Sequence, residues 1–321
     1  MKKTYTVSER KMAGVYSDTI TKIMRENKNV VELEADLGGC IMGSKMDEID
    51  QYPGQLVNCG IQEANMVGVA CGMSAAGKIP FVHSFAPFIS RRANDQIFIS
   101  GCYSHANVKL VGSDPGIMAA YNGGTHMPFE DVGIYRSFPG MTIMDIDEVM
   151  LEKLLHQLVD LKGMYYIRCA RKAVVRLYDS QEEFEIGKGK ELRKGTDVTI
   201  IASGIMTAES LKAADVLAEK GISARVVDMF TIKPLDKELV LKCAEETGAV
   251  VTAENHSMYN GLGSAVCEVL AENLPVPVER IGIEDEFGEV GDMEYLKKRF
   301  HLTAEDIVKK AEKAIERKSK K

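Results

Sequence analysis

The chain has 321 residues, of which 45% are hydrophobic and 27% are charged, and its formal net charge is −7 at pH 7. This length suits roughly two domains of common size, and the acidic balance excludes the basic stripe of a nucleic-acid-binding surface. No segment approaches the roughly 20 apolar residues that a membrane span needs. The seven cysteines are odd in number and lack metal-ligand spacing, which favours reduced thiols in a cytoplasmic protein.

Helices and strands alternate along the first half of the chain. Ser8 is expected to cap a helix that runs to about Asn27, because apolar residues recur on one face of that segment. That face comprises Met12, Val15, Ile20, Ile23 and Met24. The elements predicted after it are a strand over 30–35, a helix from Glu63, a strand over 79–83, a helix over 87–102, a strand over 108–112 and further alternating elements over 130–137, 142–144, 147–159 and 165–169.

Residues 179–195 are polar and glycine-bearing, which predicts a linker between a domain of residues 1–178 and a domain of residues 196–321. The run Gly187-Lys188-Gly189-Lys190 lacks the strand-to-helix context of a phosphate loop. The second half is predicted to contain strands over 197–202, 224–230, 249–253 and 278–281, helices over 206–220, 237–246 and 262–272, and a last helix opened by a capping box at Thr303. This alternation predicts an α/β fold of two doubly wound domains with mostly parallel sheets.

Glu63 heads the most informative segment of the chain. Almost every residue between it and Gly72 is small or apolar, so we expect its carboxyl to be largely buried. A buried carboxyl favours its protonated form and can hold or share a proton at neutral pH. The alternative is an acid at a helix N-terminus that backbone donors satisfy.

Several segments together resemble the transketolase family of thiamine-diphosphate enzymes. The segment Gly60-Ile61-Gln62-Glu63-Ala64-Asn65-Met66 resembles the family's G-I-x-E-x-N-M motif. Family-like segments follow over 79–81, 84–88, 95–97, 124–131, 136–140 and 166–171, and in the second half over 227–236, 254–256 and 261–266. The resemblance covers nearly the whole chain, and it implies the family's pyrimidine-binding domain followed by its C-terminal domain.

The resemblance implies roles in cofactor binding and catalysis. In the family, the residue that matches Glu63 hydrogen-bonds the ring nitrogen N1′ of thiamine diphosphate and so helps to activate the cofactor. Phe85 and Phe88 would line the pocket for the flat aminopyrimidine ring, with ordinary core aromatics as the alternative. Asp36 and Leu37 match the family's A-D-L corner, where the end of a strand meets the ligand. Asp36 alternatively caps a helix or forms a turn.

The resemblance also implies substrate-binding residues. His126 would be a catalytic residue that also binds substrate, close to the donor's C1 hydroxyl and the covalent intermediate. Arg10 and Arg171 would bind the anionic end of a sugar. The alternatives are an exposed loop histidine and surface ion pairs. The chain departs from the family where Asp114 replaces a substrate-side histidine and where Asn122, with the residue before it, replaces an acidic pair. These departures leave cofactor activation intact but put the usual pentose-phosphate substrates in doubt.

A full transketolase begins with a further domain that binds the diphosphate and magnesium through a G-D-G…N motif, and here Gly-Asp occurs only at Gly291-Asp292. We therefore expect no metal ligand in this chain and a separately encoded partner subunit in an α2β2 complex. The expected function is the C-terminal subunit of a split transketolase, a transferase that moves a two-carbon ketol unit from a ketose to an aldose. The alternatives are the β subunit of a 2-oxo acid dehydrogenase E1 component, a 1-deoxyxylulose-phosphate synthase-like enzyme, and a non-catalytic scaffold subunit.

Overall fold

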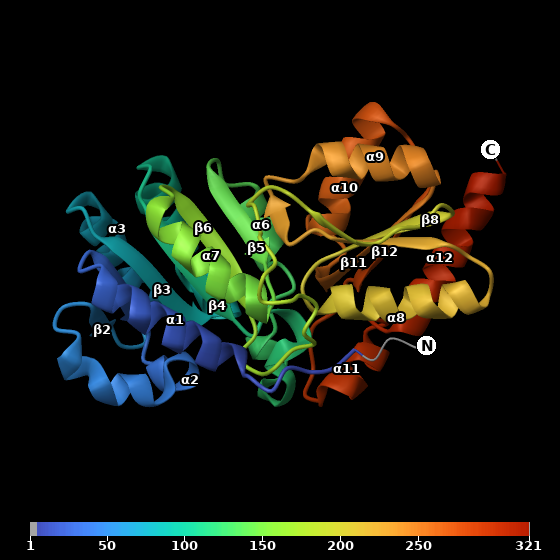
Figure 1. The fold of residues 1–321 in the computed structure, drawn as a ribbon. Coiled ribbons are helices and arrows are strands. Elements are labelled where there is room, and N and C mark those ends of the chain that lie inside the picture. Colours follow the sequence, from blue (N-terminus) through green and yellow to red (C-terminus); the bar gives the residue numbers. More distant parts are fainter. Residues whose placement is uncertain (1–4, 321) are drawn as a thin grey trace. The chain divides into compact units, whose positions relative to one another are not determined.

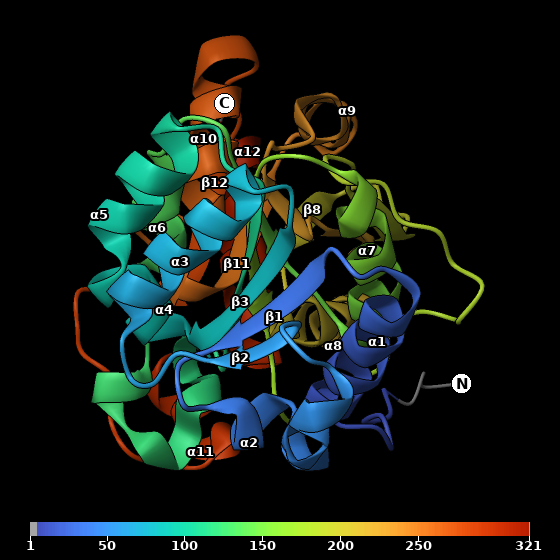
Figure 2. The same cartoon turned by 90° about the vertical axis from the view of Figure 1, so that its left-hand side faces the viewer.

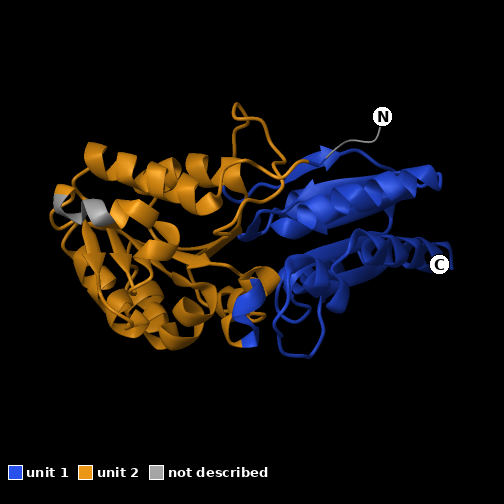
Figure 3. Cartoon of the chain, turned by 90° about the horizontal axis from the view of Figure 1, so that it is seen from below, with its two compact units in different colours: residues 1–5, 120–124, 185–321 blue, residues 6–119, 125–184 orange. Residues whose placement is uncertain are grey.

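The computed structural model describes residues 5–320, without the side chains of residues 47–50. The chain divides into two compact units (Figure 3). The first unit comprises residues 6–119 and 125–184, and the second comprises residues 120–124 and 185–320 together with Tyr5. Among the described residues, no helix has the length and apolar character needed to cross a membrane.

The first unit is built on a sheet whose strands run in the order β5-β6-β4-β3-β1-β2, with every pair parallel. In Figure 2, α1 and α7 lie on one face of this sheet and α3 and α4 on the other. The elements up to residue 169 are α1 (Met12–Glu26), β1 (Val30–Glu34), α2 (Gly38–Ile41), η1 (Gly43–Gln51), β2 (Leu56–Asn58), α3 (Glu63–Ala75), β3 (Ile79–Phe85), α4 (Ala86–Arg92), α5 (Asn94–Gln96), η2 (Ile97–Tyr103), β4 (Val108–Ser113), η3 (Gly116–Asn122), η4 (Gly124–His126), α6 (Asp131–Arg136), β5 (Met141–Asp145), α7 (Glu148–Asp160) and β6 (Met164–Cys169) (Figure 1).

The strands predicted in this unit are confirmed, and β1, β4 and β6 are buried along their whole length, as expected for parallel strands covered on both faces. The apolar face predicted for the first helix is also buried. Its predicted cap is wrong. The helix begins at Met12, and the Ser8 hydroxyl oxygen instead accepts a hydrogen bond from the Arg10 N–H at 3.1 Å.

The predicted helix over 87–102 is interrupted. It consists of α4, the single turn α5 and the π-helical segment η2. The backbone leaves α-helical geometry at Ala93, where φ is −98° and ψ is 10°. The apolar pattern predicts one continuous helix because it reports which residues face the core and not where the hydrogen-bond spacing changes.

The second unit contains a five-stranded sheet in the order β12-β11-β8-β9-β7, parallel except for the pairing of β7 with β9. Its elements are β7 (Lys190–Arg193), β8 (Val198–Ala202), α8 (Ile205–Glu219), β9 (Ala224–Asp228), β10 (Thr231–Lys233), α9 (Lys237–Thr247), β11 (Val250–Ser257), α10 (Leu262–Asn273), β12 (Val278–Ile283), α11 (Met293–Arg299) and α12 (Ala304–Ser319). The predicted α/β class with mostly parallel sheets is confirmed in both halves.

Part of the segment predicted as a linker is ordered sheet, because residues 190–193 form the edge strand β7. The N–H groups of the preceding glycines are also bonded: Gly187 donates to the Thr231 hydroxyl and Gly189 to the Asp236 carboxylate, each at 3.1 Å. These bonds agree with the expectation that this run is no phosphate loop. The predicted cap of the last helix is confirmed, since the Thr303 side chain accepts from the Asp306 N–H.

Candidate functional site

Predicted cofactor and substrate residues of the first unit lie at the carboxyl ends of its strands. The strands are parallel, so their carboxyl ends meet at the same edge. Asp36 follows β1, Phe85 ends β3, Asp114 follows β4 and Arg171 follows β6. Glu63 opens α3 shortly after β2 ends at this edge. Open α/β sheets generally bind their ligands outside such an edge.

Glu63 is buried, with 2% of its surface exposed, as the sequence predicts. Its Oε1 accepts a hydrogen bond from the Ser84 hydroxyl at 2.9 Å, and Arg92 Nη1 donates to Oε1 at 3.2 Å and to Oε2 at 3.1 Å. The guanidinium and the hydroxyl hold this buried side chain in one orientation. A carboxylate has about four lone-pair sites, so Oε2 retains room to accept from one more donor.

The aromatic rings of Phe85, Phe88 and His126 form a cluster that also contacts Arg92, the partner of Glu63. The centroids of Phe85 and Phe88 are 5.9 Å apart, and the His126 ring meets them edge-on at 5.7 and 5.0 Å. The guanidinium of Arg92 lies over the Phe88 ring, 4.1 Å from its centroid. Phe88 is only half-buried, so part of this aromatic surface is open to a ligand.

His126 is suited to exchange hydrogen bonds as a neutral ring. Its Nδ1 lies 2.9 Å from the Thr125 hydroxyl, which leaves Nε2 for another partner. Burial, with the positive charges of Arg171 and Arg92, lowers the pKa of His126 below its ordinary value. At neutral pH the ring is therefore uncharged.

Asp114 and Arg171 form a closely bonded ion pair. Arg171 Nε donates to Asp114 Oδ2 at 2.6 Å, and the Arg171 backbone N–H donates to Oδ1 at 3.0 Å. Asp114 is buried at 3% exposure, whereas Arg171 is partly open and lies 4.7 Å from the Phe85 ring centroid. The carboxylate that replaces a histidine of the family is thus compensated by a cation, and it orients that cation.

The remaining predicted residues are placed differently. Asp36 is exposed and exchanges two hydrogen bonds with the Asn58 side chain, of 3.0 and 3.1 Å, while Leu37 precedes the first turn of α2. Arg10 is exposed, and its carboxylate partners are Asp18 and Glu152 at 3.6 and 3.7 Å, rather than any residue of the cluster. Asn122 is exposed and belongs to the 120–124 segment of the second unit.

Sequence reasoning missed Ser84 and Arg92, which hold Glu63. The sequence does place each of them near a predicted site residue. Ser84 directly precedes Phe85 within the family-like segment 84–88, and Arg92 lies four residues after Phe88, on the same side of a helix. Neither placement reveals the contact with Glu63, because 21 and 29 positions separate the partners in sequence.

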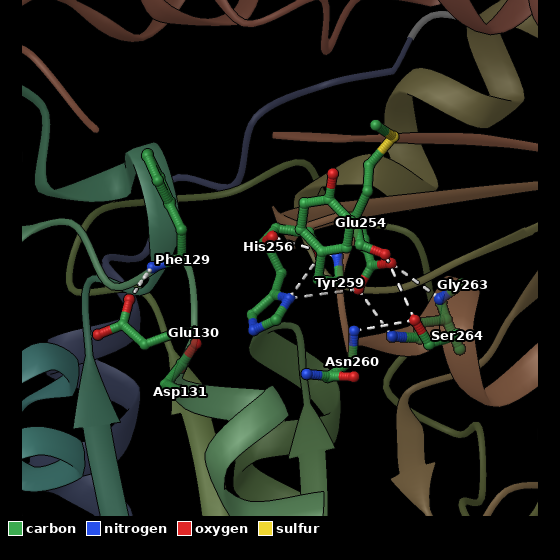
Figure 4. A network of polar contacts seen from close by, with 12 residues as sticks. Phe129, Glu130, Asp131, Glu254, His256, Tyr259, Asn260, Gly263 and Ser264 are labelled. Carbon is green, nitrogen blue, oxygen red and sulfur yellow. Dashed lines mark hydrogen bonds and ion pairs between the residues drawn. The ribbon is translucent and has the colours of Figure 1, made fainter. Parts of the chain in front are cut away.

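The second unit has a polar network of its own at the end of β11 (Figure 4). The Glu254 carboxylate accepts hydrogen bonds from the N–H groups of Leu262 and Gly263, at 2.7 and 2.8 Å, in the first turn of α10. A Cβ at Gly261 would lie 2.0 Å from Glu254 Oε2, so glycine is required there. The protein's own carboxylate thus fills the helix terminus where an external anion could bind.

Comparison with known proteins agrees with this geometry. Residues 8–175 match the family model of the transketolase pyrimidine-binding domain, and residues 187–307 match that of the transketolase C-terminal domain. The chain is 48% identical over 314 residues to a 6-deoxy-6-sulfo-D-fructose transketolase subunit of Clostridium sp., covering 98% of this chain and 97% of that relative. It is 39% identical over 298 residues to an apulose-4-phosphate transketolase subunit of Phocaeicola vulgatus, covering 92% and 95%.

Solved structures show the same architecture. A split-gene transketolase described as an inactive β4 tetramer has a TM-score of 0.87 and 38% identity, covering 97% of this chain and 100% of that one. A Pichia stipitis transketolase has a TM-score of 0.79, covers 98% of this chain and 47% of that one, and at 17% identity shows the fold alone. The chain therefore belongs to the transketolase family, and it carries the family's pyrimidine-binding domain followed by its C-terminal domain.

Proposed function

We propose that the chain is the C-terminal subunit of a split transketolase and transfers a two-carbon ketol unit from a ketose to an aldose with thiamine diphosphate as cofactor. The observation that carries the proposal is the buried Glu63 carboxyl, which is bonded to Ser84, the residue before Phe85, and to Arg92, whose guanidinium lies over the Phe88 ring. The relatives of the chain in Clostridium and Phocaeicola are both named as transketolase subunits.

The residues present suit the cofactor's aminopyrimidine ring. The flat heterocycle would lie against Phe85 and Phe88, and Glu63 Oε2 would accept a hydrogen bond from the ring nitrogen N1′. Asp36 and Leu37 would contact the cofactor from the corner after β1. When bound, thiamine diphosphate supplies an electron sink for the carbanion that ketose cleavage creates. Ser84 and Arg92 hold the Glu63 carboxylate in one orientation, so its free acceptor site is fixed in advance.

The substrate site is proposed at Arg171 and His126, with Asp114 orienting Arg171. Arg10 and Asn122 stay sequence-based predictions. A neutral His126 can donate to or accept from a sugar hydroxyl, and the partly exposed Arg171 can donate to an anionic oxygen. The Clostridium and Phocaeicola relatives are named for a sulfonated and a phosphorylated sugar. We therefore propose an anionic ketose as the donor.

We further propose an α2β2 assembly in which a separate subunit binds the diphosphate and provides the Mg²⁺ ligands. The description of a related split-gene β tetramer as inactive supports the need for a second kind of subunit. A cytoplasmic location is part of the proposal and is supported by the seven cysteines, all of which lie in the described part of the chain and are reduced thiols.

The test is Glu63→Gln in the reconstituted complex. Ketol transfer from an anionic ketose should fall by about a hundredfold or more, because a group that takes part in proton transfer typically contributes 10²–10⁴-fold. Glu26→Gln makes the same chemical change at an exposed position of the same unit and should leave the rate unchanged. If Glu63→Gln retains activity within about tenfold of the parent, the catalytic assignment is wrong, and a non-catalytic role for this chain gains weight.

A further inference from the structure

Five buried polar side chains lie in the interior of the first unit and form two neighbouring sets of hydrogen bonds. They come from α1, β1, β3 and β4, and none exposes any surface. The Tyr16 hydroxyl donates to Glu32 Oε2 at 2.6 Å, the His83 Nδ1 lies 2.8 Å from Glu34 Oε2, and the His83 Nε2 lies 2.9 Å from the Ser113 hydroxyl. We refer to Tyr16, Glu32, Glu34, His83 and Ser113 as the buried row.

The two glutamates of the buried row favour their protonated forms. Glu32 and Glu34 are two residues apart on β1, so their side chains point to the same face of the sheet. Burial raises the pKa of both carboxyl groups well above the ordinary value. The Oε1 atom of each carboxyl has no hydrogen-bond partner.

His83 is a neutral ring, because burial, with the nearby positive charge of Arg171, lowers its pKa to about 3. A neutral imidazole has one nitrogen that donates and one that accepts. His83 can therefore bond Glu34 through Nδ1 and Ser113 through Nε2 at the same time.

The row ends at the turn that carries the Asp114–Arg171 ion pair. Ser113 is the last residue of β4, and Asp114 follows with φ of +52°. That backbone conformation is costly for a residue other than glycine and persists only where the surroundings impose it. The Asp114 N–H donates to the Cys169 carbonyl at 2.9 Å on one side, and His83 tethers the Ser113 side chain on the other.

We propose that His83 and Ser113 are positioning residues, which hold the strained turn at Asp114 so that its carboxylate keeps the Arg171 guanidinium in place over Phe85. The contact chain is continuous: His83 Nε2 to Ser113, Ser113 to Asp114 by the peptide bond, and Asp114 Oδ2 to Arg171 Nε at 2.6 Å. Only the consequence for substrate binding rests on the proposed function, which assigns Arg171 to the anionic end of the donor.

The first test measures the order of Arg171 directly, by the rate at which its Nε–H exchanges with solvent in NMR spectra. His83→Asn keeps a polar group beside Glu34, because the side-chain amide occupies the place of Nδ1, but it loses the hydrogen bond to Ser113. Ser113→Ala removes the same bond from the other side. Each variant should exchange Arg171 Nε–H about five- to tenfold faster, the loss expected for one hydrogen bond, and the double variant should be no faster than either single one.

Matched variants separate positioning from a general loss of stability. Ser113→Thr keeps the hydroxyl and should restore slow exchange. Ser90→Ala removes another fully buried hydroxyl of this unit, which donates to the Ala86 carbonyl at 2.7 Å, and should leave Arg171 exchange unchanged. Unchanged exchange in the folded Ser113→Ala variant, or additive effects in the double variant, overturns the proposal.

The second test uses the complex with the partner subunit and an anionic ketose donor. Ser113→Ala should raise the donor KM by about fivefold while kcat stays within about twofold, because a hydrogen bond of ordinary strength is lost from a ground-state contact. An unchanged KM in an active complex overturns the link between the buried row and the substrate. If the parent complex transfers no ketol unit but Arg171 exchange responds as expected, the proposed function fails and the positioning role stands.

Discussion

A single residue, Glu32, is expected to contribute to the pH dependence of the protein's stability. The pKa of Glu32 is raised in the folded protein, by burial first and by the charge of Glu34 second. In the unfolded chain it returns to about 4.3. Above that pH the folded state binds more protons than the unfolded state, so the free energy of unfolding falls as the pH rises towards the folded pKa.

Glu32→Gln should remove this loss of stability at high pH. The amide carbonyl can accept from Tyr16 and the amide N–H can donate to Glu34, so the variant mimics the protonated carboxyl without titrating. Denaturant unfolding at a series of pH values should show that the variant's stability falls less steeply than the parent's above about pH 5. Parallel pH profiles would contradict the raised pKa of Glu32, and Glu26→Gln should keep the slope of the parent.

At the same scale, the sequence predicted the acid and the rings but not their partners. Glu63, Phe85 and Phe88 were expected at the site from the family's motifs, and the structure brings them and His126 to one edge of the sheet. Arg92, which pairs with Glu63, and the carboxylate partner of Arg171 were not expected. A motif identifies residue types and spacing, whereas these pairings depend on how distant strands align.

Among the elements, the start of the last helix was predicted together with its capping side chain, whereas the cap predicted at Ser8 was wrong. The Thr303 oxygen accepts from the Asp306 N–H at 3.3 Å and its hydroxyl donates to Asp306 Oδ2 at 2.7 Å, at the start of α12. Thr303→Ala should lower the free energy of unfolding by about 1 kcal/mol, the usual effect of losing such a cap. Thermal or denaturant unfolding measures this change. Thr303→Ser keeps the oxygen and should behave as the parent; an equal loss in both variants would show that the hydroxyl is not the cause.

Elements without a repeating apolar pattern were not predicted. The short strand β2, the helix α11 and the edge strand β7 lie in segments that carry charged or polar residues. Residues 190–193 read as part of a linker because an edge strand buries little surface, and polar side chains are normal there. Pairing with β9, 30 to 40 positions later, makes this segment a strand.

For the whole molecule, we expect the chain to be inactive by itself. The described chain places acids, aromatic rings and guanidinium groups at its candidate site, and the family's diphosphate and magnesium motif is expected on another subunit. Titration of the purified chain with that subunit should produce ketol transfer that saturates at one equivalent, and native mass spectrometry should detect two copies of each. Turnover by the purified chain alone, with thiamine diphosphate and Mg²⁺, would contradict this expectation.

By itself, the sequence determined the α/β class, the order of most helices and strands, the family, and the identity of the buried acid at the head of α3. These features follow from local periodicity and from motifs in which neighbouring residues act together. The tertiary structure alone decided that Arg92 holds Glu63, that Asp114 holds Arg171, and that Glu32, Glu34, His83 and Ser113 lie together in the buried row. The physical reason is that the register of β1, β3 and β4 brings their side chains together. These strands are far apart along the chain, so local sequence patterns do not indicate which of their residues meet.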